Sequence, residues 1–326
     1  MRIRNARRAV VAGALALATG LTAPAYAADA RTPLPASPHA VSSHTASPHT
    51  VSPLPSSPYT GPLRAAAPAA AVLDAPAVHG RAAYLMDASS GETLFDKHAA
   101  ERLPIASLTK TMTAYVVLKT AKPTDVVEIA RADVAYAVNG GGTTADLRAG
   151  DRLTVGELMY ALMLPSGADA AHALARTYGP GVTAFVAKMN ATARELGMND
   201  TRYVNADGLP MPGSDGYSTA RDQAVLAAEA LRNPLIRTAA GTRHHSLDAT
   251  GAHRSYAWRN TNRLLGTPGA IGLKTGFTNA AGYCLAFAGE RDGRQVVGIL
   301  LGESVSARRF ATAGALLDWG ATRQST

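Results

Sequence analysis

Two residues early in the chain could perform nucleophilic catalysis together. Ser107 and Lys110 lie three positions apart within a largely apolar run, residues 103–118, that predicts a helix. Positions three apart share one face of a helix, so the hydroxyl and the amine would be neighbours. A lysine among apolar residues loses hydration, which lowers its pKa and makes the proton-accepting form accessible near neutral pH. The pair therefore predicts a nucleophile beside its base, but Ser-x-x-Lys alone is common and needs partners elsewhere.

Two further motifs follow this pair in order. Ser166-Gly167 lies in a predicted loop 59 residues after Ser107, and Lys274-Thr275-Gly276 comes 108 residues after Ser166, at the end of a predicted strand. A cationic lysine, a hydroxyl and a residue without a side chain allow a strand to bind the anionic end of a peptide whose backbone lies alongside it. The ordered set is typical of penicillin-binding proteins and serine β-lactamases.

The elements that must position these motifs are strands from both parts of the chain and helices between them. Alternating and β-branched segments predict strands at 82–87, 92–95, 126–129, 243–247, 255–259, 270–274, 283–288 and 295–301. Apolar periodicity and capping residues predict further helices at 154–164, 168–178, 182–196, 219–232 and 305–319. Thr154 and Glu157 predict a capping box. We expect one antiparallel sheet with the helices inserted into it.

The N-terminal region predicts export. Four arginines within the first eight residues precede an apolar run, 9–22, and a small-x-small site ending at Ala27, which together are typical of a secretory signal peptide over residues 1–27. Residues 28–75 are rich in Pro, Ser, Ala and His and hold too few large apolar groups for a core, so they predict a disordered linker. Residues 76–326 remain for the folded domain.

Charge and cysteine content narrow the functional class. Four of the charges behind the formal net charge of +8 belong to the signal peptide, which leaves +4, a weak argument for a nucleic-acid partner. Cys284 is the only cysteine, so no intramolecular disulfide forms. The predicted cleavage site lacks the cysteine that lipid attachment would require, so we expect no lipid anchor. No amphipathic or apolar segment follows Trp319, so we expect a secreted, diffusible or wall-associated protein without a membrane anchor.

The chain resembles the D-alanyl-D-alanine carboxypeptidase family of low-molecular-mass serine penicillin-binding proteins over roughly residues 82–320. Besides the three motifs, the segments that carry the resemblance are 84–91, 105–115, 196–209, 217–222 and 272–284. The resemblance implies an α+β fold of the β-lactamase/DD-peptidase type, in which helices flank an antiparallel sheet and an all-helical subdomain is inserted at about 107–240. It also implies a catalytic domain over 76–326, without cofactor or metal.

The activity implied is removal of the terminal D-Ala from peptidoglycan stem peptides, with β-lactams as inhibitors. By resemblance, Ser107 would attack the carbonyl between two D-Ala residues, Lys110 would accept its proton, and Ser166 would relay a proton to the leaving amine. One position departs from the family. The middle motif usually ends in Asn, whose amide holds the catalytic lysine and the substrate, whereas Ala168 has no side chain that can hydrogen-bond.

The same resemblance assigns the substrate-binding residues. Lys274 and Thr275 would bind the terminal carboxylate, with Gly276 completing the triad. The N–H groups of the nucleophile and of Phe277 would form the oxyanion hole. Arg309 stands where the family often has a second carboxylate-binding cation, although an exposed arginine on an amphipathic last helix fits the sequence as well.

Two other functions remain open from the sequence. A serine β-lactamase would need a deacylating carboxylate, and Glu195 lies in a helix end with the wrong spacing for one. A non-hydrolytic protein that binds the cell wall or β-lactams would explain Ala168. A metal enzyme is disfavoured, since His244 and His245 are adjacent on a predicted strand and would face opposite sides.

Overall fold

The structure is a computed structural model that describes residues 74–213, 216–291 and 293–323. The predicted signal peptide, residues 1–27, and nearly all of the predicted linker, residues 28–75, lie outside these ranges.

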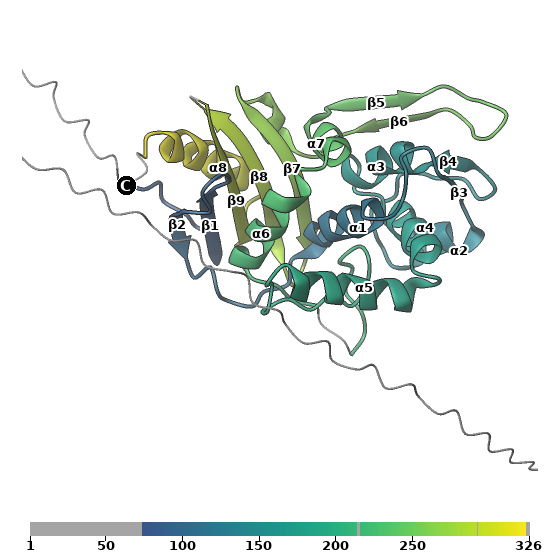
Figure 1. Cartoon of the computed structure of the whole chain (residues 1–326), viewed down its shortest axis with the longest axis horizontal. Coiled ribbons are helices and arrows are strands. Elements are labelled where there is room, and N and C mark those ends of the chain that lie inside the picture. Colours follow the sequence, from purple (N-terminus) through teal and green to yellow (C-terminus); the bar gives the residue numbers. More distant parts are fainter. Residues whose placement is uncertain (1–73, 214–215, 292, 324–326) are drawn as a thin grey trace, which may run out of the picture. The chain divides into compact units, whose positions relative to one another are not determined.

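Strands from both parts of the chain form one five-stranded antiparallel sheet in the order β2-β1-β9-β8-β7 (Figure 1). These strands are β1 (Ala82–Asp87), β2 (Thr93–Lys97), β7 (Ala270–Thr278), β8 (Gly282–Arg291) and β9 (Arg294–Glu303). A tight connection through Gly293, with φ +76°, joins β8 to β9. The expected α+β fold, with a sheet built from both parts of the chain, is confirmed.

Both faces of this sheet are covered, which explains why β1 is apolar from Ala82 to Met86. Successive side chains of a strand point to opposite faces. Ala83 and Leu85 join one core with Trp319 of α8 (Ser306–Ala321), while Tyr84 and Met86 join the other, larger core. Every residue of β1 is buried. The apolar area removed from water on both faces holds the strand in register.

A helical block lies beside the edge strand β7 (Figure 1) and comprises α1 (Thr109–Leu118), α2 (Arg131–Asn139), α3 (Val155–Met163), α4 (Ala168–Tyr178), α5 (Val182–Glu195) and α7 (Pro234–Gly241). A further helix, α6 (Ala220–Ala230), packs on the sheet against β1 and β9 and also contacts α1. The predicted capping box is present, since the Glu157 N–H donates to Thr154 Oγ1 at 3.2 Å and the Thr154 N–H donates to Glu157 Oε2 at 2.7 Å. In the described part of the chain, no helix combines the length and apolar character needed to cross a membrane.

The structure corrects the predicted arrangement of strands. β5 (His244–Leu247) and β6 (Tyr256–Arg259) form a separate two-stranded sheet and do not join the main one. β3 (Val126–Glu128) pairs with β4 (Arg152–Thr154) inside the helical block, so that block is not all-helical. The Lys274 triad also lies within β7, which continues to Thr278, and not at the end of a strand.

Two helices were not predicted, and each has a local cause. α2 begins where the Asp133 carboxylate accepts the N–H of Ala130 at 2.8 Å, a cap that the loop-like sequence around it concealed. α7 begins at Pro234, shortly after the helix predicted at 219–232. Proline also suits the first turn of a helix, and the Asn233 side chain caps this one through the N–H of Leu235 at 2.9 Å.

Candidate active site

The predicted nucleophile and base are neighbours in the structure. Ser107 lies in a short 3₁₀ turn, η1 (Ala106–Leu108), that leads directly into α1. The Lys110 Nζ atom lies 3.1 Å from Ser107 Oγ, and also donates to the main-chain oxygen of Asp207 at 3.0 Å. Lys110 is 1% exposed, whereas Ser107 is half-buried and can be reached from solvent. The pair has the geometry of an activated hydroxyl.

Burial determines the direction in which the pKa of Lys110 shifts. Loss of hydration lowers the pKa of Lys110 below its ordinary value, while the negative charges of Asp207 and Asp169 act in the opposite direction. A lowered pKa favours the neutral amine, which can accept the proton of the Ser107 hydroxyl.

Two glycines allow other segments to approach η1 closely. A β-carbon on Gly276 of β7 would lie 3.2 Å from the Ser107 backbone nitrogen and 3.0 Å from the Ile105 carbonyl oxygen. Gly208 has φ +83°, and a β-carbon there would collide with the Ala106 carbonyl. The catalytic turn is therefore held between the edge of the sheet and the loop at 205–209, and a side chain at either glycine would separate them.

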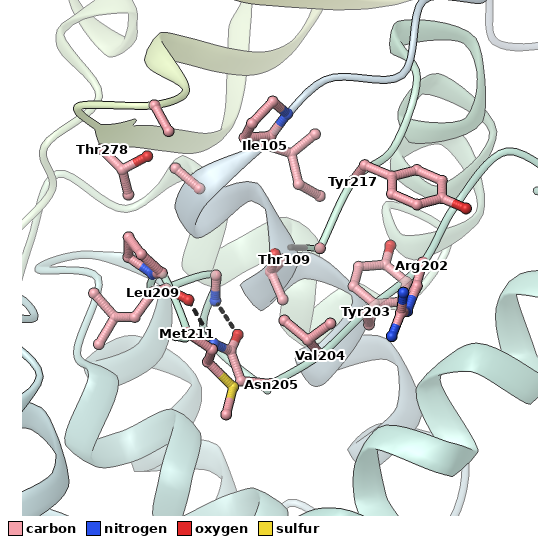
Figure 2. A pocket seen from close by; sticks show the side chains of 16 residues that line it. Ile105, Thr109, Arg202, Tyr203, Val204, Asn205, Leu209, Met211, Tyr217 and Thr278 are labelled. Carbon is pink, nitrogen blue, oxygen red and sulfur yellow. Dashed lines mark hydrogen bonds between the residues drawn. The ribbon is translucent and has the colours of Figure 1, made fainter. Parts of the chain in front are cut away.

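The loop that carries Asp207 is fixed by its own hydrogen bonds. Asn205 Oδ1 accepts the N–H of Gly208 at 2.7 Å, and its amide donates to the Leu209 carbonyl at 2.6 Å; Figure 2 shows both bonds. Thr113 of α1 donates to the Ala206 carbonyl at 2.6 Å. These bonds hold the Asp207 carbonyl in the position where it accepts a hydrogen bond from Lys110.

A small cavity lies between this loop and η1 (Figure 2). Its volume is about 60 Å³, and its lining includes Ile105, Thr109, Leu209 and Met211. The catalytic serine and the two predicted functional lysines do not line it. The cavity is too small for a peptide, so we assign it to the support of the turn and not to the site where a substrate would bind.

The middle motif combines the Ser166 hydroxyl with Ala168, whose side chain cannot form a hydrogen bond. Ser166 is buried, has φ +69°, and its Oγ has no hydrogen-bond partner among the described residues, so it is available to carry a proton. Ala168 begins α4 and is fully buried. Gly142 lies against it, since a β-carbon on Gly142 would be 3.0 Å from the Ala168 β-carbon. The loop around Gly142 thus crowds the space beside the alanine.

Lys274 and Thr275 lie in β7 next to the same turn. Lys274 is buried and donates to the main-chain oxygen of Thr275 at 3.0 Å. Burial lowers its pKa well below the ordinary value, and the positive charges of Lys110 and Arg309 lower it further. Thr275 Oγ1 lies 2.7 Å from Thr261 Oγ1. A substrate carboxylate placed here would favour the charged form of Lys274.

Arg309 and Phe277, the two remaining predicted residues, differ in burial and in how far the structure tests their predicted roles. Arg309 is only 7% exposed and donates to the carbonyls of Gly276 at 2.9 Å and Cys284 at 3.1 Å, so the alternative of an exposed arginine is wrong. The Phe277 ring is half-exposed and stacks on Tyr283 with centroids 4.4 Å apart. The role predicted for Phe277 belongs to its backbone N–H and stays a prediction.

The histidines contribute no metal site among the residues that the structure describes, where no group of three or more His, Cys, Asp or Glu side chains could hold an ion. His245 stacks on Tyr160 with centroids 3.7 Å apart, and His172 Nδ1 lies 2.7 Å from Asp133 Oδ1. Both are structural contacts.

Comparison with known protein families decides the class of this site. The model of the D-alanyl-D-alanine carboxypeptidase family matches residues 69–305. The chain belongs to this family. The resemblance inferred from the three motifs is confirmed, and with it the expectation of a serine-type D-Ala-D-Ala carboxypeptidase at the level of the family.

Individual members of the D-alanyl-D-alanine carboxypeptidase family show how much of the chain the likeness covers. A D-alanyl-D-alanine carboxypeptidase of Streptomyces sp. strain K15 is 38% identical, over 78% of this chain and 91% of its own. DacF of Bacillus subtilis is 32% identical, over 76% of this chain and 63% of its own. The crystal structure of the Streptomyces K15 DD-transpeptidase aligns with a TM-score of 0.72 and 36% identity, over 76% of this chain and 99% of that one.

The part of the site that sequence reasoning missed is the Asp207 carbonyl. Its role depends on a main-chain atom, which no side-chain motif encodes. The signal available in the sequence was Asn205 and Gly208 around it, a pair typical of a tight, internally bonded loop.

Proposed function

We propose that the protein is a secreted serine carboxypeptidase that removes the terminal D-Ala from peptidoglycan stem peptides through an acyl-enzyme on Ser107. The observation that carries the proposal is the 3.1 Å contact between Ser107 Oγ and a buried Lys110, in a turn that packs closely against Gly276 of the Lys274-Thr275-Gly276 motif. Family membership supports the reaction class.

The reaction follows from these positions. Neutral Lys110 takes the Ser107 proton as Oγ attacks the carbonyl carbon between the two D-Ala residues. The N–H groups of Ser107 and Phe277 stabilise the oxyanion. As the carbon–nitrogen bond breaks, Ser166 passes its hydroxyl proton to the leaving amine and receives in exchange the proton held by Lys110, which returns to the neutral form. Water then hydrolyses the serine ester, which releases the shortened peptide and restores the hydroxyl.

Recognition of the substrate falls to the cationic side of the site. Lys274 and Thr275 bind the terminal carboxylate, and Arg309 adds positive charge behind them. β-Lactams, which carry a carboxylate beside a strained amide, acylate Ser107 by the same route. The arginine-rich, apolar start of the sequence supports action outside the cytoplasm.

Release of D-Ala from a synthetic peptide ending in Lys-D-Ala-D-Ala tests the proposal. We expect release by the wild type and none by Ser107→Ala. Rapid turnover of nitrocefin without D-Ala release would favour a serine β-lactamase instead. Neither reaction, together with retained binding of the peptide, would favour a non-hydrolytic binding protein.

A further inference from the structure

A buried carboxylate with few donors belongs to the residue whose carbonyl holds the catalytic lysine. The Asp207 side chain is 1% exposed, and its Oδ2 atom has no hydrogen-bond partner among the described residues. Its Oδ1 atom accepts the N–H of Leu209 at 3.1 Å and the hydroxyl of Tyr136 at 3.2 Å. A buried charge is costly unless donors surround it. Tyr136, the one side chain in the described ranges that donates to this carboxylate, therefore has a large share in holding it.

The ring of Tyr136 is fixed independently of that hydroxyl. Tyr136 lies on α2 and stacks on the His172 ring of α4, with centroids 4.5 Å apart. His172 Nδ1 in turn lies 2.7 Å from the carboxylate of Asp133, which also pairs with Arg176. Burial and then the charge of Asp207 raise the pKa of Tyr136, so its hydroxyl remains a donor near neutral pH. Phenylalanine at this position would keep the stacked ring and lose only the donor.

The end of α2 packs directly on the loop that carries Asp207. A β-carbon on Gly140 would lie 3.1 Å from Leu209 Cδ1, and one on Gly142 would lie 2.9 Å from the same atom. A β-carbon on Gly142 would also lie 3.0 Å from the Ala168 methyl. The helix that carries Tyr136 and the catalytic loop are therefore in close contact beside the alanine of the middle motif.

Two carboxylates act on Lys110, and they differ in how they are supported. Burial lowers the pKa of Lys110, and the charges of Asp207 and Asp169 raise it. Asp169 accepts from several main-chain N–H groups, which no single side-chain substitution removes. Asp207 depends instead on one main-chain N–H and the hydroxyl of Tyr136. The positive charge of Lys274, on β7, opposes that of Lys110. Of these three charges, that of Asp207 is the one that a change at Tyr136 would alter.

We propose that Tyr136 is a positioning residue of the catalytic base. Its hydroxyl holds the Asp207 carboxylate and screens part of its negative charge, and so limits how strongly that charge favours the protonated amine of Lys110. Tyr136 acts through Asp207 and is not itself catalytic. The inference rests on the proposed function only for the role of Lys110 as the base.

The pH profile of acylation by a fluorescent penicillin tests this role. Without the tyrosine hydroxyl, more of the Asp207 charge should act on Lys110, so Tyr136→Phe should move the acidic limb of the acylation rate to higher pH. The shift should be smaller than the about 1–3 units that a new opposite charge causes, because an existing charge is only unscreened. A merely structural role would lower the rate at every pH and leave the limb in place.

Two further variants show whether the effect passes through the carboxylate. In Asp207→Asn the charge is absent, so adding Tyr136→Phe should shift the limb no further. Tyr115→Phe is the matched control, because Tyr115 also donates to a carboxylate, that of Glu229 at 3.4 Å. The charges that act on Lys110 do not include that of Glu229, so this variant should keep the limb of the wild type.

The outcomes separate this inference from the proposed function. An unmoved limb in Tyr136→Phe, a shift to lower pH, or an equal loss of rate at every pH would overturn the inference. An equal shift in Tyr115→Phe, or in the Asp207→Asn background, would overturn it as well. Acylation without release of D-Ala from Lys-D-Ala-D-Ala would overturn the proposed function and leave the inference standing, whereas a wild type that penicillin does not acylate would overturn both.

Discussion

The amine of Lys110 donates to the main-chain carbonyl of Asp207 at 3.0 Å, on a loop that belongs to none of the three catalytic motifs. In the family the lysine is usually held by an Asn at the position of Ala168. Here the alanine methyl faces Gly142, and the Asp207 carbonyl supplies the acceptor. A main-chain carbonyl cannot be removed by substitution at one residue, so this support for the base is insensitive to side-chain identity.

The charge of Asp207 should nevertheless tune the base. Its carboxylate raises the pKa of Lys110, against the larger effect of burial. Asp207→Asn keeps the main-chain carbonyl and removes the charge, so the pKa of Lys110 should fall further. Because Lys110 must be neutral to accept a proton, the acidic limb of the pH profile of kcat/KM should move to lower pH. A limb that stays in place, or moves to higher pH, would contradict this assignment.

Burial of the Lys110 amine should lower the free energy of unfolding near neutral pH. The pKa of Lys110 is lower in the folded than in the unfolded chain, so the unfolded chain binds more protons and the associated penalty is lost as pH rises towards the unfolded value of about 10.5. Lys110→Met should abolish D-Ala release and increase the free energy of unfolding at pH 7 by about 1–3 kcal/mol. Thermal denaturation at several pH values measures this. A gain in stability that grows from pH 7 to pH 10 would be inconsistent with the argument.

The close approach of β7 to the catalytic turn should not tolerate a side chain. Gly276→Ala places a methyl 3.0 Å from the Ile105 carbonyl oxygen and 3.2 Å from the Ser107 nitrogen, which would displace the turn. We expect acylation by a fluorescent penicillin to slow, but by less than the ~10²-fold that a misplacement of about 1 Å costs, because the turn has to move by only a few tenths of an ångström. Gly314→Ala, on α8 with no atom within 4 Å of the added methyl, is the control and should acylate normally. Equal rates for both variants would refute the steric argument.

The cluster that joins α2 to α4 should matter for stability and not for chemistry. The Asp133 side chain is fully buried and accepts from Arg176 at 2.9 Å, with His172 Nδ1 at 2.7 Å. Burial would raise the pKa of Asp133, but these hydrogen bonds outweigh it and lower the pKa. Asp133→Ala should reduce the free energy of unfolding by about 3 kcal/mol at neutral pH.

The effect of Asp133→Ala should shrink as pH falls, since the stabilisation is lost once the native carboxylate is protonated. Asp200→Ala, which breaks an exposed pair with Arg102, is the control and should change stability little. If acid does not narrow the difference between the wild type and Asp133→Ala, the charged cluster is not its source.

The sequence predicted most of this fold because its signals were local. The Thr154 capping box and the short runs of strand-forming residues, such as 82–87, each involve a few neighbouring residues. The separate β5–β6 pair could not be predicted, since strand propensity does not say which partner a strand selects. The burial of Arg309 and the acceptor at Asp207 also depend on segments far apart in the chain.

In the catalytic site, too, the local features were predictable from the sequence and the features that depend on distant segments were not. The three-residue spacing correctly predicted that Ser107 and Lys110 are neighbours, with side-chain atoms 3.1 Å apart. The predicted helix over 103–118 is shorter in the structure, because α1 begins at Thr109 and Ser107 lies in the 3₁₀ turn before it. The burial of Ser166 without a partner and the crowding beside Ala168 depend on tertiary packing, which the motif order alone does not contain.

Mass spectrometry of the protein after incubation with penicillin tests the central claim most directly. The account predicts a single covalent adduct on the proteolytic peptide that contains Ser107, and no adduct on the Ser107→Ala variant. Retention of the adduct by Ser107→Ala, or an adduct mapped to another residue of the wild type, would contradict the assignment of the nucleophile.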